Sequence, residues 1–244
     1  MSKNIVIVGG HGNVSLRLAR LLTPNHSVTS IIRNSAHEED IIATGARPLQ
    51  LSLETSTISE FTDAFRGVDV VYFSAGAGGS GGEERTKKVD YEGAIKVFDA
   101  IEGLDSTARP RLILVSAVDV RDPEKIPEHY TEKDIEISKR VRGAIPAYMR
   151  WKYEADKNLV QRTTFKWFIL RPGGLTNQPG IGKGDIGRTH ITTTISRDDV
   201  AKTLALLVNR EDAAGLALDL VGGETPLEQA LDAAISKGET DFLG

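Results

Sequence analysis

The sequence predicts an α/β fold, namely an open, doubly wound parallel sheet with helices on both faces and a small C-terminal substrate-side segment. Short runs of apolar and β-branched residues recur along the 244 residues, and stretches long enough for amphipathic helices separate most of them. The runs are almost continuously apolar and do not alternate with polar residues. This pattern is typical of parallel strands that are buried on both faces.

Each element follows from this pattern in chain order. The expected strands are Ile5–Val8, Val28–Ile32, Val68–Phe73, Leu112–Val115, Phe165–Leu170 and Leu216–Val221. The expected helices are Val14–Leu22, Glu83–Ile101, Pro146–Val160 and Arg197–Val208. Two glycine-rich segments, Ala75–Gly82 and Thr176–Thr194, are expected to be irregular loops. Because no internal repeat or low-complexity linker interrupts the chain, we expect one domain over 1–244, with substrate-side elements near 121–147 and 176–196.

Composition excludes several classes of protein. The sequence is 40% hydrophobic and 26% charged, which is typical of a compact domain and not of a disordered or fibrous chain. A net charge of -4 lacks the basic surplus of nucleic-acid-binding proteins, so we expect no nucleic-acid partner. The chain has no cysteine, and its five histidines lack the i, i+4 spacing of a helical metal clamp. We therefore expect no disulfide and no metal site.

The first apolar run, Ile5–Val8, is far shorter than the roughly 20 residues that cross a bilayer. It is also shorter than the apolar region of a secretory signal. The absence of cysteine fits a reducing compartment. We therefore expect a cytoplasmic protein, monomeric or homodimeric, with a small-molecule substrate and no membrane partner.

A glycine-rich turn follows the first expected strand. Glycines at Gly9 and Gly12 let the backbone turn sharply and approach a pyrophosphate, whose charge the N–H groups of the next helix would stabilise. The alternative is an ordinary strand-to-helix turn, and the position directly after the first strand makes it less favoured. Ser15 departs from the usual dinucleotide motif, which has a glycine there for close helix packing. The expected cofactor contacts of this turn are Gly9, His11, Gly12, Asn13 and Val14.

Arg33 stands at the end of the second expected strand. NAD-preferring sites usually carry an acid at this place, which binds the adenine ribose. An acid would repel a 2′-phosphate, whereas a guanidinium forms charge-assisted hydrogen bonds with it. The sequence therefore favours NADP(H) over NAD(H) as the cofactor, with a solvated surface arginine as the alternative interpretation.

Tyr148 and Lys152 lie four residues apart on one face of an expected helix. In that position the ammonium would lower the pKa of the phenol and make Tyr148 a proton donor closer to neutral pH. Tyr153 and Lys157 repeat the spacing, and either pair can also be an ordinary packing pair. Ser116, at the end of the fourth expected strand, adds a hydroxyl that could hydrogen-bond a substrate oxygen.

Taken together, these residues resemble the atypical short-chain dehydrogenases/reductases, which have a Rossmann fold, and specifically the branch near the NmrA-like proteins and the biliverdin reductase B-like flavin reductases. The likeness covers nearly the whole chain. Besides the Gly9/Gly12 turn and Arg33, it rests on Phe73-Ser74-Ala75-Gly76-Ala77-Gly78, Val89-Asp90-Tyr91-Glu92-Gly93-Ala94, Val115-Ser116-Ala117, Tyr148-x-x-x-Lys152 with Ala155-Asp156, Leu170-Arg171-Pro172-Gly173-Gly174-Leu175-Thr176, Ile195-Ser196-Arg197-Asp198-Asp199-Val200-Ala201, and Val221-Gly222-Gly223-Glu224-Thr225-Pro226.

The resemblance implies a role for each candidate residue at the reaction end. The family's spacing between its lysine and its Arg-Pro-Gly turn fits Lys152 and not Lys157. By this likeness, Lys152 would bind the nicotinamide ribose hydroxyls and lower the pKa of Tyr148, while Ser116 would orient a substrate carbonyl. Asp199 would belong to a structural helix start.

The resemblance also implies contacts along the rest of the cofactor. Ala75 and Gly76 would lie along the adenosine half, and the nicotinamide pocket would be lined by Pro172, Gly173 and Gly174. The pair Ser52-Leu53 stands where many members have an aspartate that contacts adenine.

Three functions remain open from the sequence. The first is an NADPH-dependent oxidoreductase that transfers hydride to a small carbonyl, quinone or flavin-like acceptor. The second is a non-catalytic NADP(H)-sensing regulatory protein of the NmrA-like type. The third is a nicotinamide-dependent epimerase or dehydratase, which is weaker because the segment after Thr176 is short for a nucleotide-sugar site. Retention of the tyrosine, lysine and serine favours the enzyme over the sensor.

Overall fold

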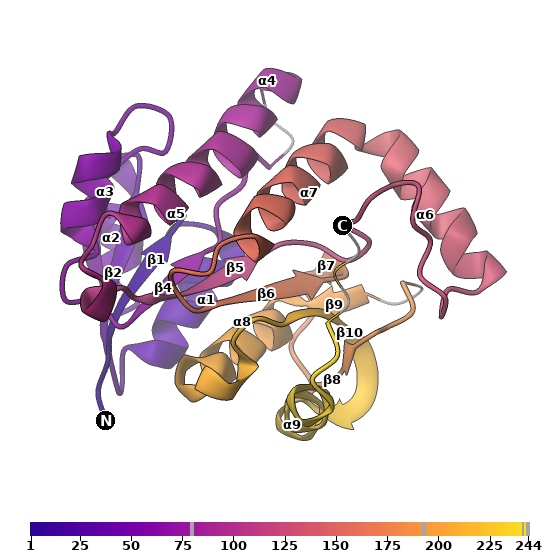
Figure 1. The fold of residues 1–244 in the computed structure, drawn as a ribbon. Helices are drawn as coiled ribbons and strands as arrows, with labels where there is room; N and C mark the ends of the chain where they lie inside the picture. Colours follow the sequence, from indigo (N-terminus) through magenta and orange to yellow (C-terminus); the bar gives the residue numbers. More distant parts are fainter. Residues whose placement is uncertain (79–80, 192–193, 241, 243–244) are drawn as a thin grey trace.

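A mostly parallel sheet runs through the centre of the molecule and carries helices on both faces (Figure 1). The computed structural model describes residues 1–78, 81–191, 194–240 and 242. The sheet has eight strands in the order β3-β2-β1-β4-β5-β6-β10-β8. Every neighbouring pair in it is parallel except β10 with β8. The predicted doubly wound α/β fold is confirmed.

The described strands and helices have the following bounds. The strands are β1 (Asn4–Val8), β2 (Ser27–Ile32), β3 (Arg47–Gln50), β4 (Val70–Phe73), β5 (Arg111–Val115), β6 (Trp167–Pro172), β7 (Gly174–Thr176), β8 (Lys183–Gly187), β9 (Thr194–Ser196) and β10 (Ala217–Pro226). The α-helices are α1 (Asn13–Leu22), α2 (Glu38–Ile42), α3 (Ile58–Ala64), α4 (Gly82–Thr86), α5 (Gly93–Glu102), α6 (Glu132–Ala144), α7 (Pro146–Val160), α8 (Arg197–Leu206) and α9 (Leu227–Lys237). Lys87–Glu92 is a π-helix, and Ser35–His37 is one of four short 3-10 turns.

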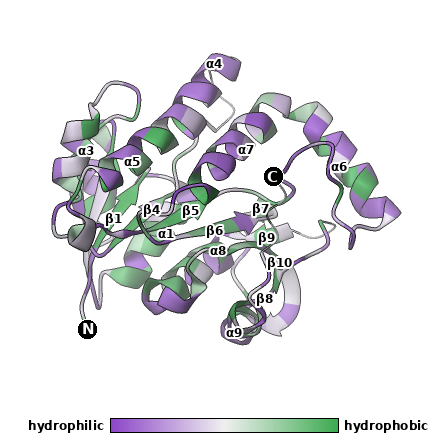
Figure 2. Ribbon diagram, in the orientation of Figure 1, coloured by the Kyte–Doolittle hydropathy of each residue, from purple (hydrophilic) through white to green (hydrophobic). Residues whose placement is uncertain are grey.

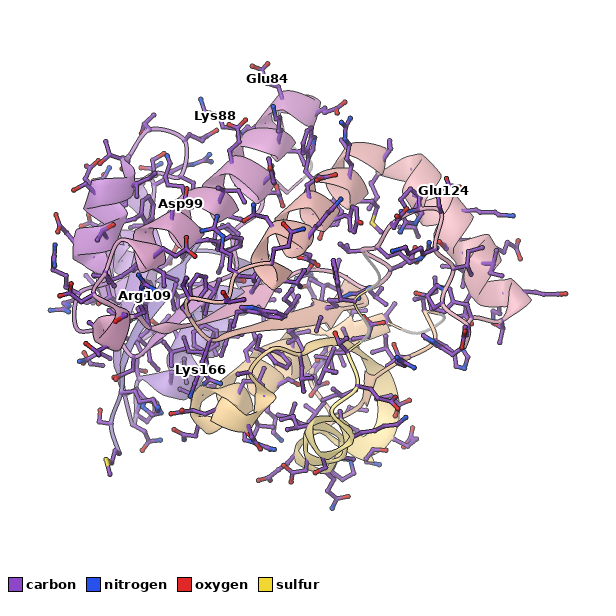
Figure 3. All side chains as sticks on the ribbon, in the orientation of Figure 1. Glu84, Lys88, Asp99, Arg109, Glu124 and Lys166 are labelled. Carbon is purple, nitrogen blue, oxygen red and sulfur yellow. The ribbon has the colours of Figure 1, made fainter. Side chains whose placement is uncertain are left out.

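Two apolar layers hold the helices to the sheet. Successive residues of β1 alternate between them: Ile5 and Ile7 pack with α1, α8 and α9, while Val6 and Val8 pack with α3, α5 and α7. Figure 2 shows the strands as largely hydrophobic and the helices as hydrophilic on their outer sides. Charged side chains such as Glu84, Lys88 and Glu124 extend from the surface (Figure 3). The continuous apolar runs of the sequence therefore reflect burial on both faces of the strands.

Several elements differ from the sequence-based expectation. The predicted helix Glu83–Ile101 is three consecutive segments, because the chain passes through the π-helix Lys87–Glu92 between α4 and α5. The expected loop Thr176–Thr194 contains the antiparallel strand β8, and its ends pair as β7 and β9. Residues 79–80 and 192–193, within the two expected glycine-rich loops, lie outside the described residues.

The chain reverses its direction of winding between β1 and β4, and most candidate residues lie at or just after the carboxyl ends of β1, β2, β4, β5 and β6, while Tyr148 and Lys152 lie in α7. In open α/β sheets, ligands bind in the crevice that such a reversal creates at the carboxyl ends of the strands. In the described part of the chain, no helix is both long and apolar enough to cross a membrane.

Gly10 is required for the contact between the glycine-rich turn and β2. A Cβ at this position would lie 2.6 Å from Cβ of the buried Ser30. We expect Gly10→Ala to lower the free energy of unfolding by about 1–3 kcal/mol through overpacking, and Ser30→Gly in the same chain to recover part of the loss. Urea unfolding followed by circular dichroism measures both.

Gly143→Ala is the matched control for Gly10→Ala. Gly143 lies in α6, and a Cβ there would meet no atom within 4 Å of the described structure. Alanine is also the better helix former, so this change should leave stability unchanged or raise it. Equal effects of the two substitutions would contradict the steric argument for Gly10.

Candidate functional site

The glycine-rich turn brings β1 close to the loop after β4. Gly9 has a φ of +81°, and a Cβ there would lie 2.7 Å from Cα of Ala75. Gly12 donates its N–H to the Gly9 carbonyl at 3.0 Å and caps α1 without a side-chain hydrogen bond. The result is a tight backbone turn in front of a helix N-terminus, an arrangement that suits a phosphate group.

A cavity of about 330 Å³ opens beside this turn. Its walls come from the carboxyl ends of β1, β2 and β4 and from the segments that follow β3 and precede α5. Six predicted cofactor residues line it together, namely Gly9, His11, Gly12, Arg33, Ala75 and Gly76. The structure thus brings together the residues assigned to the pyrophosphate and adenosine part of a dinucleotide.

Charged side chains occupy one end of this cavity. Glu54 lies between two arginines: one carboxylate oxygen is 3.4 Å from Nη1 of Arg33 and the other is 3.4 Å from Nε of Arg85. All three side chains line the cavity. Arg33 is 59% exposed, so its guanidinium can leave the carboxylate and meet an entering anion at little cost. The sequence analysis did not identify Glu54 or Arg85, because nothing in their spacing links them to Arg33.

The remaining cofactor candidates lie outside this cavity. Asn13 and Val14 begin α1, and the Val14 side chain packs in the core, so any cofactor contact of Val14 is through its backbone. Pro172 and Gly173 are tied to the sheet: the Pro172 carbonyl accepts the Val118 N–H at 3.0 Å, and the Gly173 N–H donates to Leu220 at 2.9 Å. Gly174 begins β7.

Lys152 lies at the centre of the second group of candidate residues, which includes Tyr148 and Ser116. Its Nζ donates to the Val115 carbonyl at 3.2 Å and lies 3.4 Å from Oδ1 of Asp90. The second Asp90 oxygen accepts the Ala77 N–H at 2.9 Å, so Asp90 connects Lys152 to the wall of the cavity. Burial lowers the pKa of Lys152, but the charges of Asp90, Tyr148 and Asp156 together raise that pKa above its ordinary value. Lys152 is therefore a fixed cation.

Tyr148 lies beside this cation, as the spacing predicted. Nζ of Lys152 is 5.9 Å from the centre of the Tyr148 ring. The charge of Lys152 lowers the pKa of the phenol, which is the expected direction, but it does not set the net shift. Burial raises the pKa of Tyr148 by more than Lys152 lowers it, and the carboxylates of Asp90 and Asp156 raise it further. The net pKa of Tyr148 therefore lies above its ordinary value.

Ser116 has a partner that the sequence analysis did not assign. Its hydroxyl donates to Oδ2 of Asp156 at 2.7 Å, and both residues are buried. Burial raises the pKa of Asp156 to about 6, against the lowering effects of Ser116, Arg171 and Lys152. The Ser116 proton therefore points to a carboxylate in this structure and not to an open substrate position.

Gly10, Asp90 and Asp156 have no site role predicted from the sequence, although each lies in a recognisable motif or turn. Gly10 lies within the glycine-rich turn. Asp90 and Asp156 lie within two of the family-like motifs, and Asp156 follows Lys152 by four residues on the same helix. An acid one helical turn after the lysine was the sequence feature that could have identified Asp156.

The substrate-side segments are held together by a second acid. Asp134, at the start of α6, is buried, and its oxygens contact Nδ1 of His190 at 2.8 Å and the N–H of Ile191 at 2.9 Å. Asp199 lies in the first turn of α8, where its N–H donates to the Ser196 hydroxyl, as a structural helix start requires. Its carboxylate also accepts the N–H groups of Ile181 and Gly182. These contacts hold residues 181–182 of the expected loop against α8 and residues 190–191 against α6.

A family model described as NAD(P)H-binding matches residues 9–211. The chain belongs to this NAD(P)H-binding family. A UPF0659 protein of Schizosaccharomyces pombe is 39% identical over 244 residues, with 97% of each chain covered. YhfK of Bacillus subtilis, named an uncharacterized sugar epimerase, is 33% identical over 229 residues, which is 93% of this chain and 98% of YhfK.

A solved structure from Bacillus halodurans, assigned to the NAD-dependent epimerases/dehydratases, superposes with a TM-score of 0.79 at 28% identity. The superposition covers 95% of this chain and 100% of the Bacillus halodurans chain. The expectation of an atypical short-chain dehydrogenase/reductase with a Rossmann fold is thereby confirmed. The findings also agree with the expectation of an enzyme of the short-chain type.

The buried Asp156 should make stability depend on pH. Its ordinary pKa is 3.8 and its folded pKa is about 6, so between these values the folded protein holds a proton that the unfolded chain has lost. The free energy of unfolding should therefore fall by up to about 3 kcal/mol as pH rises through this window. The asparagine of Asp156→Asn cannot titrate, so this variant should lack the decrease in the free energy of unfolding that comes from Asp156.

Urea unfolding from about pH 4 to about pH 7 measures the free energies of unfolding of the wild type and of Asp156→Asn. Their difference reports Asp156, since all other groups titrate in both proteins. Ser116→Ala supplies a second comparison. It removes a hydrogen bond that lowers the pKa of Asp156, so the fall should move to higher pH. Parallel curves for the wild type and Asp156→Asn would show that Asp156 keeps an ordinary pKa.

Proposed function

We propose that the protein is an NADPH-dependent oxidoreductase that transfers hydride to a small carbonyl, quinone or flavin-like acceptor. The observation that carries this proposal is the continuity between the two ends of the site. Asp90 contacts both Ala77, in the cavity wall, and Lys152, beside Tyr148 and Ser116. A dinucleotide seated on the Gly9/Gly12 turn would thus lead toward a proton donor and a fixed cation.

Each side chain has a distinct task in this proposal. NADPH, when bound, supplies the hydride. Lys152 holds positive charge beside the ribose, and Tyr148 donates its phenolic proton to the substrate oxygen as negative charge develops there. Ser116 would give this oxygen a second hydrogen bond once its hydroxyl turns from Asp156. The proton lost from Tyr148 returns from water.

The raised pKa of Tyr148 bears on the choice of acceptor. A firmly held proton is a weaker acid in a carbonyl reduction, whereas a quinone or flavin accepts hydride with much less help from a protein acid. NADPH oxidation measured against a panel of carbonyls, quinones and flavins tests the proposal directly. No turnover with any acceptor, together with a change in oligomeric state on NADPH binding, would favour the sensor.

The epimerase alternative has one finding in its favour, because the relative from Bacillus subtilis is named a sugar epimerase. An epimerase keeps its nicotinamide bound and returns the hydride to the substrate. It would therefore be purified with the dinucleotide and would not consume added NADPH. The same panel distinguishes the two functions.

We further propose that the site prefers NADP(H) over NAD(H) through Arg33. A charge-assisted hydrogen bond is worth roughly 1.5–3 kcal/mol, so Arg33→Ala should reduce the preference for 2′,5′-ADP over 5′-AMP about tenfold or more. Calorimetry with these two nucleotides measures it without requiring turnover. An unchanged preference would make Arg33 a surface residue.

Glu54→Gln should change the same preference in the opposite direction. The Glu54 carboxylate lies between Arg33 and Arg85 and would repel a phosphate that approaches them. The amide keeps the shape of the side chain and loses the charge, so affinity for 2′,5′-ADP should rise while that for 5′-AMP stays nearly constant. A fall in both affinities would mean that Glu54 serves to position the arginines.

Tyr148→Phe tests the proton donor. With a carbonyl acceptor, turnover should fall by about 10²–10⁴-fold, the usual contribution of a positioned acid, and NADPH affinity should barely change. With a quinone or flavin the fall should be much smaller. The matched control is Tyr153→Phe, because Tyr153 also precedes a lysine by four residues but stacks on Phe242. Equal losses in both variants would contradict the assignment.

A further inference from the structure

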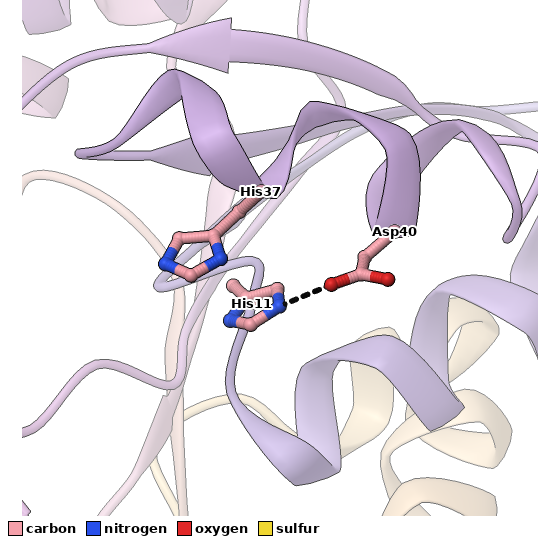
Figure 4. A group of neighbouring side chains, drawn as sticks. All are labelled: His11, His37 and Asp40. Atoms are coloured by element: carbon pink, nitrogen blue, oxygen red, sulfur yellow. Dashed lines mark hydrogen bonds and ion pairs between the residues drawn. The ribbon is translucent and has the colours of Figure 1, made fainter.

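Two histidines and an aspartate that are distant in sequence meet beside the glycine-rich turn (Figure 4). The His11 and His37 rings stack with their centres 3.6 Å apart and their planes 20° apart. Nε2 of His11 lies 2.8 Å from Oδ2 of Asp40. One ligand atom from each of the three residues lies within 4.8 Å of the others.

The backbone fixes all three residues in this arrangement. His11 belongs to the turn closed by the bond from the Gly12 N–H to the Gly9 carbonyl. His37 ends the 3-10 turn that Asn34 caps with its side chain, and its N–H donates to the Asn34 carbonyl at 3.1 Å. Asp40 follows three residues later in α2, on the same side of the helical segment as His37. The three donors are therefore partly preorganised.

We propose that His11, His37 and Asp40 bind a divalent first-row transition metal, with Zn²⁺ as the reference ion. Two imidazole nitrogens and a carboxylate oxygen are ligands that Zn²⁺, Co²⁺ and Ni²⁺ prefer over the harder Mg²⁺ and Ca²⁺. This site stands on its own geometry and does not depend on the proposed hydride transfer.

The distances are close to what such an ion needs. Ligand atoms at about 2.0–2.2 Å from a tetrahedral ion are about 3.4 Å from one another. One ligand atom from each residue already lies within 4.8 Å of the others, so the donors have to approach by at most about 1.4 Å. The two imidazole planes are 20° apart, so the His37 ring has to turn out of the stack to direct a nitrogen at an ion shared with His11. The 2.8 Å contact of His11 with Asp40 has to lengthen by about half an ångström. The Asp40 side chain is 63% exposed and can make this movement.

Three protein ligands leave a fourth coordination position, as in zinc sites that bind water or a ligand. His11 and His37 also line the cavity described above. No metal site was expected from the sequence, because the histidines lack the i, i+4 spacing of a clamp on a single helix. Here a turn supplies one ligand, and a short helical segment supplies two at i, i+3.

Titration of the chelator-treated protein with Zn²⁺ tests the site by calorimetry. We expect one equivalent to bind to the wild type and to raise the unfolding temperature, because the ion binds the folded state. His37→Ala should weaken Zn²⁺ binding by at least about tenfold and remove the thermal shift. Circular dichroism confirms that the variant is folded, and His37 lies outside the backbone turn, so the substitution leaves Gly9 and Gly12 in place.

The chain offers a matched control in His129 and His190. Their ring centres are 6.2 Å apart, and His190 already contacts the buried Asp134. The double variant His129→Ala/His190→Ala should bind Zn²⁺ like the wild type. Absence of a stoichiometric Zn²⁺ signal in the wild type, equal binding by His37→Ala, or loss of binding in the control would each overturn the proposal.

Discussion

The buried ammonium of Lys152 is the interaction on which the rest of the site depends. It joins α7 to β5 through the Val115 carbonyl and to the π-helix through Asp90, and Asp90 in turn holds the Ala77 backbone. A buried charge is tolerated only where partners replace the lost water, and removing one partner leaves the other uncompensated at a cost of about 3–5 kcal/mol. The same ion pair therefore holds the helices around the site and aligns its two ends.

The two ends of the site have opposite physical character. The end lined by Arg33, Arg85 and Glu54 is partly open, and Arg33, which is 59% exposed, can change its partner at little cost because water screens its charge. The other end, around Lys152, is mostly buried, and there desolvation raises the pKa values of Tyr148 and Asp156. Affinity and selectivity for a ligand would thus be set at one end, and proton transfer at the other.

The sheet could be predicted from the sequence because its central strands are apolar on both faces. Strand β3 was missed because Arg47–Gln50 is mostly polar, and β8 was missed because the glycines of Lys183–Gly187 resemble a loop. The site residues lay in recognisable motifs, but their partners did not follow from spacing. The contact of Ser116 with Asp156, for example, spans 40 residues and exists only once α7 packs on β5. Desolvation of Tyr148 is likewise a product of packing, so the direction of its pKa could not be predicted from Lys152 alone.

The position of Pro48 has a consequence for how copies of the chain meet. It lies in β3, at one edge of the sheet, opposite Ser30 of β2. Leu51 donates its N–H inward to Ile32, and N–H groups alternate in direction along a strand, so the missing N–H of Pro48 falls on the open edge. A strand from another molecule finds one donor fewer there, which disfavours growth of the sheet into fibrils.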